Sequence, residues 1–209
     1  MDRAHNEALR QRIAARCAAF QRLDHGGHPP GLKRAAVAIT VLERTAHEPP
    51  GFLLTRRAAG LRAHSLQWAL PGGRCDPGED AVGAALRELQ EELGLALEAA
   101  DVLGVLDDYP TRSGYLVTPV VAWAGCDPAL SLNPHEVSSV HRIELAAIEA
   151  EDAFDFVRIP ESERRVVRLR FEDDFIHAPT AALIYQFREV LAGRATRVAD
   201  LEQPVFAWK

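Results

Sequence analysis

Three glutamates with helical spacing are the residues of this sequence whose types and positions most directly suggest chemistry. Glu88 and Glu92 are four residues apart and would share one face of a helix, with Glu91 beside them. Carboxylates this close repel one another, so a cation is expected among them. Oxygen ligands without His or Cys favour Mg²⁺ or Mn²⁺. Taken alone, however, three such glutamates are more often a solvated acidic face.

The flanking residues predict the helix that would hold these glutamates. A Pro77-Gly78 turn precedes an acidic pair that favours a helix start, and Gly94 is typical of a helix end. Between them, apolar residues recur at helical spacing and should face the core: Val82, Ala85, Leu86, Leu89 and Leu93. We therefore predict a helix over residues 80–93 whose glutamates lie on a different face from its apolar residues.

Apolar and β-branched segments elsewhere predict the elements that would position this helix. Two further helices are expected, over residues 4–22 and 179–191. Strands are expected over residues 35–42, 51–55, 102–106, 115–123, 138–145 and 166–171. Pro119 within one of these strands predicts a sheet edge or a bulge. Because helices and strands mix without strict alternation or an internal repeat, an α+β layered domain is favoured over a doubly wound sheet.

The composition along the chain predicts three parts. We expect an N-terminal helix and linker over residues 1–30, a main domain over residues 31–193 and a C-terminal tail over residues 194–209. The N-terminal helix is amphipathic and should pack either on the main domain or on a partner. A homodimer is therefore one of the arrangements left open.

Length and charge exclude several classes of protein. With 209 residues, 47% of them hydrophobic, the chain has the composition of one soluble globular domain. Its 24 basic and 30 acidic residues give a net charge of −6, and no convincing local basic patch is present, so neither nucleic acid nor a membrane surface is an expected partner. The sequence has no apolar stretch long enough to span a bilayer and no recognisable secretory leader, so we expect a cytoplasmic protein.

The segment from Gly73 to Leu95 as a whole resembles the Nudix box. That motif reads Gly-x5-Glu-x7-Arg-Glu-U-x-Glu-Glu-x-Gly-U, where U is an aliphatic residue. Every specified position matches: Gly73, Glu79, Arg87, Glu88, Leu89, Glu91, Glu92, Gly94 and Leu95. The resemblance implies a Nudix αβα sandwich with a mixed β-sheet and a loop-helix-loop motif. It also implies a hydrolase that uses a divalent metal to cleave a nucleoside diphosphate linked to another moiety.

The resemblance assigns roles to individual residues of this segment. Glu88 and Glu92 would be the leading metal ligands, Glu91 a further ligand or a base, and Gly73 a carbonyl ligand. The chemistry agrees with such a site, because a catalyst must neutralise the diphosphate oxygens and acidify the attacking water. A cluster of Mg²⁺ ions can do both.

Other residues would support this chemistry. The resemblance implies that Glu79 and Arg87 brace the loop through a salt bridge rather than touch the substrate. A carboxylate must also accept the proton of the attacking water, and Glu91 or Glu136 could do so. Glu136 lies in a turn-prone stretch and is otherwise an ordinary surface glutamate.

The segment just upstream, residues 53–73, resembles a signature of the coenzyme A diphosphatase branch of the Nudix proteins. The branch pattern is Leu-Leu-Thr-x-Arg-Ser-x3-Arg-x3-Gly-x3-Phe-Pro-Gly-Gly. The chain matches it at Leu53, Leu54, Thr55, Arg57, Arg62, Pro71, Gly72 and Gly73. It departs at Ala58, Leu66 and Leu70, and a later segment carries His177 and Ala178 where the branch usually has Trp and Gly.

The substrate implied by this resemblance is a small nucleotide, namely CoA or acyl-CoA, cleaved to 3′,5′-ADP and 4′-phosphopantetheine or its acyl form. Alternatives are ADP-ribose, a nucleotide sugar or a nucleoside triphosphate, and a nucleotide-sensing module without turnover. Arg57 and Arg62 are candidates for binding phosphate, since guanidinium groups match phosphate oxygens, or else are surface arginines. His64 and Gln67 would contact the substrate or stabilise their loop.

Overall fold

The computed structural model describes residues 3–23, 31–43, 48–59 and 67–208. The helices are α1 (Arg3–Ala19), α2 (Ala81–Leu93), α3 (Leu145–Glu149) and α4 (Thr180–Leu191), with short 3₁₀ helices η2 (Ala99–Asp101) and η3 (Val205–Trp208). The strands are β1 (Lys33–Leu42), β2 (Gly51–Arg57), β3 (Trp68–Ala69), β4 (Gly72–Arg74), β5 (Val102–Val105), β6 (Tyr109–Pro110), β7 (Tyr115–Trp123), β8 (Val137–Glu144), β9 (Phe154–Ile159), β10 (Ser162–Phe171) and β11 (Asp174–His177). Two candidates from the sequence, Arg62 and His64, lie outside the described residues.

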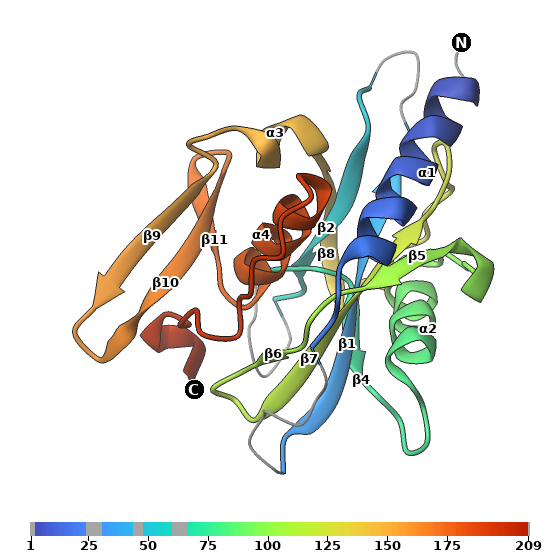
Figure 1. Ribbon diagram of the computed structural model, residues 1–209. Helices are drawn as coiled ribbons and strands as arrows, with labels where there is room; N and C mark the ends of the chain where they lie inside the picture. Colours follow the sequence, from blue (N-terminus) through green and yellow to red (C-terminus); the bar gives the residue numbers. More distant parts are fainter. Residues whose placement is uncertain (1–2, 24–30, 44–47, 60–66, 209) are drawn as a thin grey trace.

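A mixed sheet of eight strands forms the centre of the fold (Figure 1). Its main path runs β3-β2-β1-β7-β5, with β4 paired to β1, β8 to β2 and β6 to β7. β1 and β7 are parallel, from Lys33 opposite Tyr115 to Val41 opposite Trp123, and the other pairs are antiparallel. A second sheet of β11, β10 and β9 lies beside α4. This mixed arrangement confirms the α+β class expected from the sequence.

Alternating side chains of β1 contribute to two cores, one on each face of the sheet. Ala36 and Ala38 belong to the buried cluster that contains Leu89 of α2. Ile39 points the other way and belongs to the cluster that contains Phe187 of α4 and the buried residues of α1. Helix α2 therefore covers one face, and α1 and α4 cover the other, which gives the three layers of the αβα sandwich.

β1 and β2 separate beyond their short pairing, so the sheet divides into two arms. One arm contains β1 and β4, and the other contains β2, β3 and β8. β1 pairs with β2 through Val41 and Leu42, whereas residues 35–37 of β1 pair with β4. β2 continues to Arg57 between β3 and β8. The end of β2 and the start of β4 thus belong to different arms, and both approach the glutamate-bearing face of α2, as described below.

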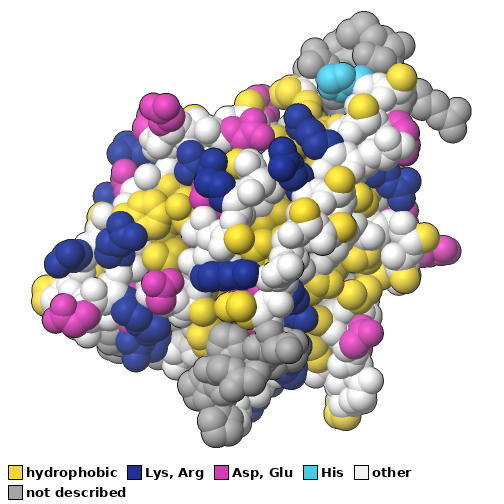
Figure 2. Space-filling model, in the orientation of Figure 1, with side chains coloured by type: hydrophobic (Ala, Val, Ile, Leu, Met, Phe, Trp, Pro, Cys, Tyr) yellow, Lys and Arg dark blue, Asp and Glu magenta, His cyan; other side chains and the backbone are white. Residues whose placement is uncertain are grey.

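Helix α1 packs on the main domain, which is the first of the two arrangements expected for it. Leu9, Ile13 and Cys17 are buried in the same core as residues of α4. The exposed side of the helix carries Arg10, which donates to the carbonyl of Ala100 at 3.1 Å. None of the described helices combines the length and the apolarity that crossing a membrane requires. Basic and acidic side chains are interspersed over the face shown in Figure 2.

Of the two outcomes expected for Pro119, a sheet edge or a bulge, the edge is wrong, whereas the β5–β7 pairing does contain a register shift, between Val102 and Gly104. β7 lies between β1 on one side and β5 and β6 on the other. The carbonyl of Pro119 accepts from the N–H of Leu106 at 3.0 Å, and its nitrogen faces that same side. β5 ends at Val105 and β6 begins at Tyr109, so the missing N–H falls in the gap between these two partners. An interior strand accommodates the proline because its neighbour is interrupted there.

A buried carboxylate ties the C-terminal tail to the domain. Glu202 is 1% exposed and accepts hydrogen bonds from Arg112, Arg164, Ser162 and the N–H of Gln203. Burial by itself would raise the pKa of Glu202, but these donors lower it to about 2. A parallel bridge from Glu202 to β10 completes the attachment. Residues 201–203 are thus fixed against the second sheet.

We predict that Glu202 contributes stability that disappears in acid. Its pKa is about 2 in the folded protein against an ordinary value of 4.5, so the contribution is complete above pH 4.5 and is lost as the pH falls towards 2. In urea unfolding at pH 7, the Glu202→Gln protein should be about 2–3 kcal/mol less stable than the wild type. The difference should shrink as the pH falls through this window.

Glu163→Gln is the matched control, because Glu163 is an exposed residue of β10. Its effect should stay within about 0.5 kcal/mol. An equal loss of stability in both variants, or a Glu202 effect that is the same at every pH, would contradict the proposed role of this carboxylate.

Candidate active site

Helix α2 is fixed at both ends by caps that its sequence encodes. The carboxylate of Asp80 accepts from the N–H of Gly83 at 2.7 Å. Gly94 ends the helix with a φ of 67°, in the left-handed region, and a Cβ there would lie 2.8 Å from Ser131. The observed span, Ala81–Leu93, confirms the helix predicted over residues 80–93. The caps hold the glutamates of this helix at a fixed height against the sheet.

Three carboxylates converge where the two arms of the sheet meet α2. Oxygens of Glu88, Glu92 and Glu136 all lie within 4.8 Å of one another. The first two are one turn apart on α2, and Glu136 immediately precedes β8. The N–H of Ala58 donates to the carbonyl of Glu136 at 2.8 Å, which ties that segment to the end of β2. This group, the carboxylate cluster, is a candidate cation site made of hard oxygen donors.

Glu92 is the most buried member of the carboxylate cluster, with 3% of its surface exposed. Its Oε2 accepts from the N–H of Gly72 at 3.2 Å, and its Oε1 lies 3.9 Å from Nη1 of Arg57. Burial raises the pKa of Glu92 to about 8, although Arg57 and the Gly72 N–H act in the opposite direction. A further positive charge close to this carboxylate would lower its pKa and favour the ionised form.

Glu88 lies directly against the backbone of β4. A Cβ on Gly73 would be 2.2 Å from Oε1 of Glu88, so any larger residue here would displace that carboxylate. Burial raises the pKa of Glu88, and a hydrogen bond from Arg87 opposes that effect. The glycine of the motif therefore has a steric role that the sequence did not indicate, besides the carbonyl ligand expected there.

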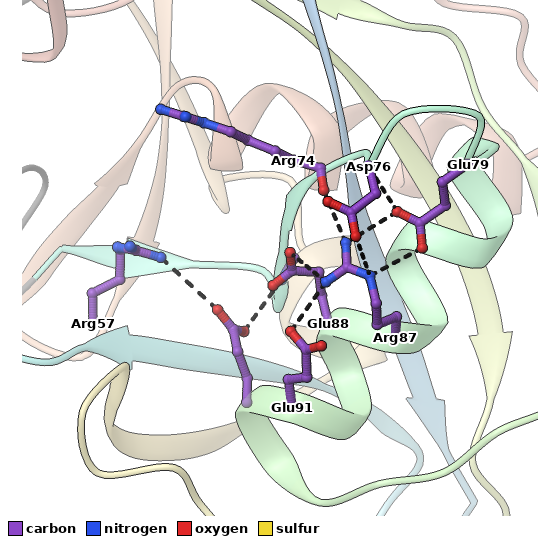
Figure 3. A network of polar contacts seen from close by, with 9 residues as sticks. Arg57, Arg74, Asp76, Glu79, Arg87, Glu88 and Glu91 are labelled. Carbon is purple, nitrogen blue, oxygen red and sulfur yellow. Dashed lines mark hydrogen bonds and ion pairs between the residues drawn. The ribbon is translucent and has the colours of Figure 1, made fainter.

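One arginine connects the acidic side chains around the carboxylate cluster (Figure 3). Arg87 donates to Glu79 through Nε at 3.0 Å and through Nη2 at 3.1 Å. Its Nη1 lies 3.0 Å from both Glu88 and Glu91, and its Nη2 also reaches the carbonyl of Arg74 at 2.9 Å. The hydrogen bond from Arg87 lowers the pKa of Glu79. The pair matches the expected brace, but Arg87 also positions Glu88, which the sequence analysis missed.

Glu91 is adjacent to Glu88 but is not a member of the carboxylate cluster. Its side chain is 52% exposed, and Nη1 of Arg87 lies 3.0 Å from both its Oε2 and Oε1 of Glu88. Among the described residues, Glu136 is the one whose oxygen lies within 4.8 Å of both Glu88 and Glu92. The sequence offered Glu136 only as a base, because nothing in a turn-prone stretch indicates which distant helix it will meet. The roles of Glu91 as ligand or base stay predictions.

The candidates for substrate binding fall into two groups. Arg57 ends β2 with its guanidinium directed towards Glu92 (Figure 3). Its N–H donates to the carbonyl of Gln67 at 3.0 Å, so these two residues are neighbours across the β2–β3 pair. Gln67 also lines a cavity on the outer side of β3. Arg62 and His64 belong to the part of the chain that is not described, and their roles stay predictions.

The donor set of the carboxylate cluster fits a hard divalent cation. Mg²⁺ prefers carboxylate oxygens and completes its shell with water and phosphate oxygens. Glu88 and Glu136 are partly exposed, so the cluster is open to solvent on one side. Burial is the main cause of the raised pKa values of Glu88 and Glu92, and the nearby arginines oppose it without cancelling it. A bound cation would favour the ionised carboxylates.

Comparison with known proteins gives the family. The NUDIX domain model matches residues 32–167. A protein of Pectobacterium atrosepticum named uncharacterized Nudix hydrolase NudL is 33% identical over 180 residues, which cover 79% of this chain and 90% of that protein. A NudL protein of Escherichia coli K12 is 36% identical over 156 residues, covering 73% and 79%.

A solved structure of similar fold is that of RenU, described as a Nudix hydrolase from M. Smegmatis. It has a TM-score of 0.51 and 21% sequence identity, and the match covers 81% of this chain and 91% of that one. This likeness supports the fold, while the family model and the NudL relatives supply the family. The chain therefore belongs to the Nudix hydrolase family.

Proposed function

We propose that the protein hydrolyses a nucleoside diphosphate linked to another moiety, with Mg²⁺ or Mn²⁺ held by Glu88, Glu92 and Glu136. The observation that carries this proposal is the convergence within 4.8 Å of Glu88 and Glu92, on the helix of the Nudix box, with Glu136, which precedes β8. When bound, the cation would neutralise diphosphate oxygens and acidify the attacking water. The sequence contains no nucleophile elbow, so direct attack by water is the expected route.

Different residues around the carboxylate cluster would bind the phosphate and accept the proton of the attacking water. Arg57 stands beside Glu92 and suits a phosphate oxygen, because a guanidinium group donates two parallel hydrogen bonds. Glu136 serves either as a third ligand or as the acceptor of the proton from water, and in the first case Glu91 is the acceptor. Arg87 acts through Glu88 and Glu91 rather than on the substrate.

CoA or acyl-CoA is the substrate we propose, with 3′,5′-ADP and 4′-phosphopantetheine or its acyl form as products. The proposal rests on the CoA-branch signature in residues 53–73 and on the position of its Arg57 beside Glu92. Two departures from that signature, Ala58 and Leu70, are 6% and 4% exposed. They belong to the packing of the domain, so they offer almost no surface to a substrate. Leu66 lies outside the described residues.

The cellular location and the oligomeric state are inferred from the sequence alone. We propose that the protein acts on its small-molecule substrate in the cytoplasm, with a homodimer as one arrangement. Light scattering coupled to size-exclusion chromatography would give the oligomeric state.

The substrate proposal is tested by digesting CoA with the purified protein and Mg²⁺ and identifying the products by mass. We expect 3′,5′-ADP and 4′-phosphopantetheine, and no products when EDTA removes the metal. ADP-ribose, a nucleotide sugar and a nucleoside triphosphate are digested in parallel. Faster cleavage of one of these would transfer the substrate assignment to it. Failure to cleave any of them with either metal would overturn hydrolysis and favour a nucleotide-sensing module.

Replacing Glu92 tests the carboxylate cluster. Glu92→Gln should lower kcat on the best substrate by at least about 10²-fold, because losing a charged oxygen ligand removes several kcal/mol of transition-state stabilisation. Mn²⁺ affinity, measured by calorimetry, should fall as well. The metal-free variant should resist urea as well as the wild type, since burial raises the pKa of Glu92 and disfavours its charged form, and glutamine is a neutral side chain of the same shape.

The control for this substitution is Glu149→Gln, at an exposed position of α3. It should leave both kcat and Mn²⁺ affinity unchanged. Wild-type kcat and Mn²⁺ affinity in the Glu92→Gln protein would show that the metal site lies elsewhere.

Two glycine-to-alanine substitutions should affect different properties: Gly73→Ala should lower Mn²⁺ affinity, and Gly83→Ala should raise the stability of the helix. In Gly73→Ala the new Cβ would displace the carboxylate of Glu88, and we expect Mn²⁺ affinity to fall by about 10- to 100-fold, as for a misplaced ligand. In Gly83→Ala the nearest atoms lie at 3.4 Å, an ordinary contact, so the helix should gain about 0.4–1 kcal/mol of stability. Calorimetry with Mn²⁺ and urea unfolding measure the two effects. Equal Mn²⁺ affinity in both variants would contradict the position assigned to Glu88.

A further inference from the structure

A cavity of about 220 Å³ lies on the outer side of β3, away from the carboxylate cluster. Its walls come from β3, β11, the start of α4 and the 3₁₀ helix η3. The lining residues that matter below are Gln67, Trp68, Asp174, His177, Thr180 and Phe206. Sites for whole drug-sized ligands are larger, about 300–1,000 Å³, so this cavity has room for one ring system and not for a complete dinucleotide.

The cavity has an aromatic wall with one ring left open to solvent. Phe206 is 55% exposed, although large apolar side chains are usually covered. Its ring lies edge-on to His177, with ring centroids 5.2 Å apart. Phe175, another lining residue, has Arg168 over its ring at 3.9 Å. A planar group entering the cavity would therefore find Phe206 and His177 as its aromatic neighbours.

The position of Phe206 is fixed by the tail that precedes it. Glu202 is buried on Arg112 and Arg164, and Gln203 accepts from the N–H of Arg112 at 2.6 Å. The N–H of Ala207 then donates to the carbonyl of Pro204 at 2.9 Å. An exposed ring on a tail without fixed contacts would not indicate a binding role. The ring of Phe206 is instead held in place by the ion pairs of the buried Glu202, four residues earlier, and forms a fixed wall of the cavity.

The polar groups of the cavity exclude phosphate and suit a neutral heterocycle. Asp174 would repel an anion. Burial, with Arg168 nearby, lowers the pKa of His177 and so favours the neutral imidazole, while a hydrogen bond with the backbone of Phe175 engages one of its two ring nitrogens. Gln67 and Thr180 add an amide and a hydroxyl group to the lining. A purely aliphatic chain would gain nothing from these groups.

The cavity begins one strand away from the proposed phosphate site. The carbonyl of Gln67 accepts from the N–H of Arg57 at 3.0 Å, and Arg57 reaches to within 3.9 Å of Glu92. Neighbouring strands are about 4.8 Å apart. A nucleotide whose phosphate is bound by Arg57 could thus pass its base over the edge of β3 into the cavity.

We propose that this cavity binds the purine base of the nucleotide substrate, with Phe206 as the ring against which the base packs. The inference rests on the proposed function, because it takes the diphosphate to lie at Arg57 and the carboxylate cluster. It assigns a role in substrate recognition to the C-terminal tail, which is far from the Nudix box in the sequence.

The test compares the binding of AMP and ribose 5-phosphate, which share a phosphate and a ribose and differ by the adenine base. Calorimetry in the presence of Mg²⁺ should show that wild-type protein binds AMP more tightly. Removing the aromatic ring in Phe206→Ala should weaken AMP binding by about 5-fold or more, the usual effect of losing a ring that stacks on a base. Ribose 5-phosphate affinity should not change.

Val205→Ala is the matched control. Val205 precedes Phe206 in η3, is 37% exposed and does not line the cavity. AMP affinity should equal that of the wild type in this variant. Equal losses in both variants, or none in Phe206→Ala, would overturn the proposal. Amide chemical shifts give a second measurement, since AMP should perturb His177 and Thr180, and shifts confined to other regions would also overturn it.

This experiment separates the present proposal from the proposed function. AMP binding at Phe206 without cleavage of any nucleotide would support the base site and overturn hydrolysis. Metal-dependent cleavage that Glu92→Gln abolishes, combined with AMP affinity that Phe206→Ala leaves unchanged, would support hydrolysis and overturn the base site. If phosphopantetheine rather than AMP loses affinity in Phe206→Ala, the cavity belongs to the other half of the substrate and the proposal is wrong.

Discussion

The burial of carboxylates held close together is the constraint to which the rest of the site responds. Glu92 is almost completely buried, and burial raises its pKa to about 8. Arg57 and the N–H of Gly72 act against this rise but do not cancel it. Packing a helix face against a sheet would be easier with apolar side chains at these positions. A carboxylate in such surroundings is costly to keep ionised, and titratable groups with strongly shifted pKa values gather at functional sites.

The arrangement of the sheet follows from the need to bring these carboxylates together. Glu88 and Glu92 are one helical turn apart, so local geometry alone aligns them. Glu136 must come from another part of the chain, and its segment is tied to Ala58 at the end of β2. β4 must pass close to Glu88, which the missing side chain of Gly73 permits. The divided sheet supplies both approaches, because one arm carries β4 and the other carries β2 and β8.

How much the sequence could predict depends on the range of the interactions involved. The caps and apolar period of residues 80–93 act within a few residues, and the helix they predicted is present with its ends shifted by one residue at most. The pairing of Glu79 with Arg87 has the same short range and also matches the geometry. By contrast, the meeting of Glu136 with Glu88 requires the register of β8 on β2, which no local pattern contains. Pro119 misled for the same reason, since the gap opposite it belongs to other strands.

The residues that indicate the reaction class are close together in the sequence, whereas those proposed to determine substrate choice come from distant segments. The helix that carries Glu88 and Glu92 lies close in the sequence to Gly73, which explains why the reaction class can be inferred from a motif. The proposed base site instead combines β3, β11, α4 and η3. Its most exposed ring depends on a tail whose composition predicts no structure and which Glu202 attaches to β10. Substitutions in any of these segments can change the cavity while the carboxylate cluster stays intact. The same catalytic helix can therefore serve different nucleotides, and substrate identity has to be sought in the distant segments rather than in the motif.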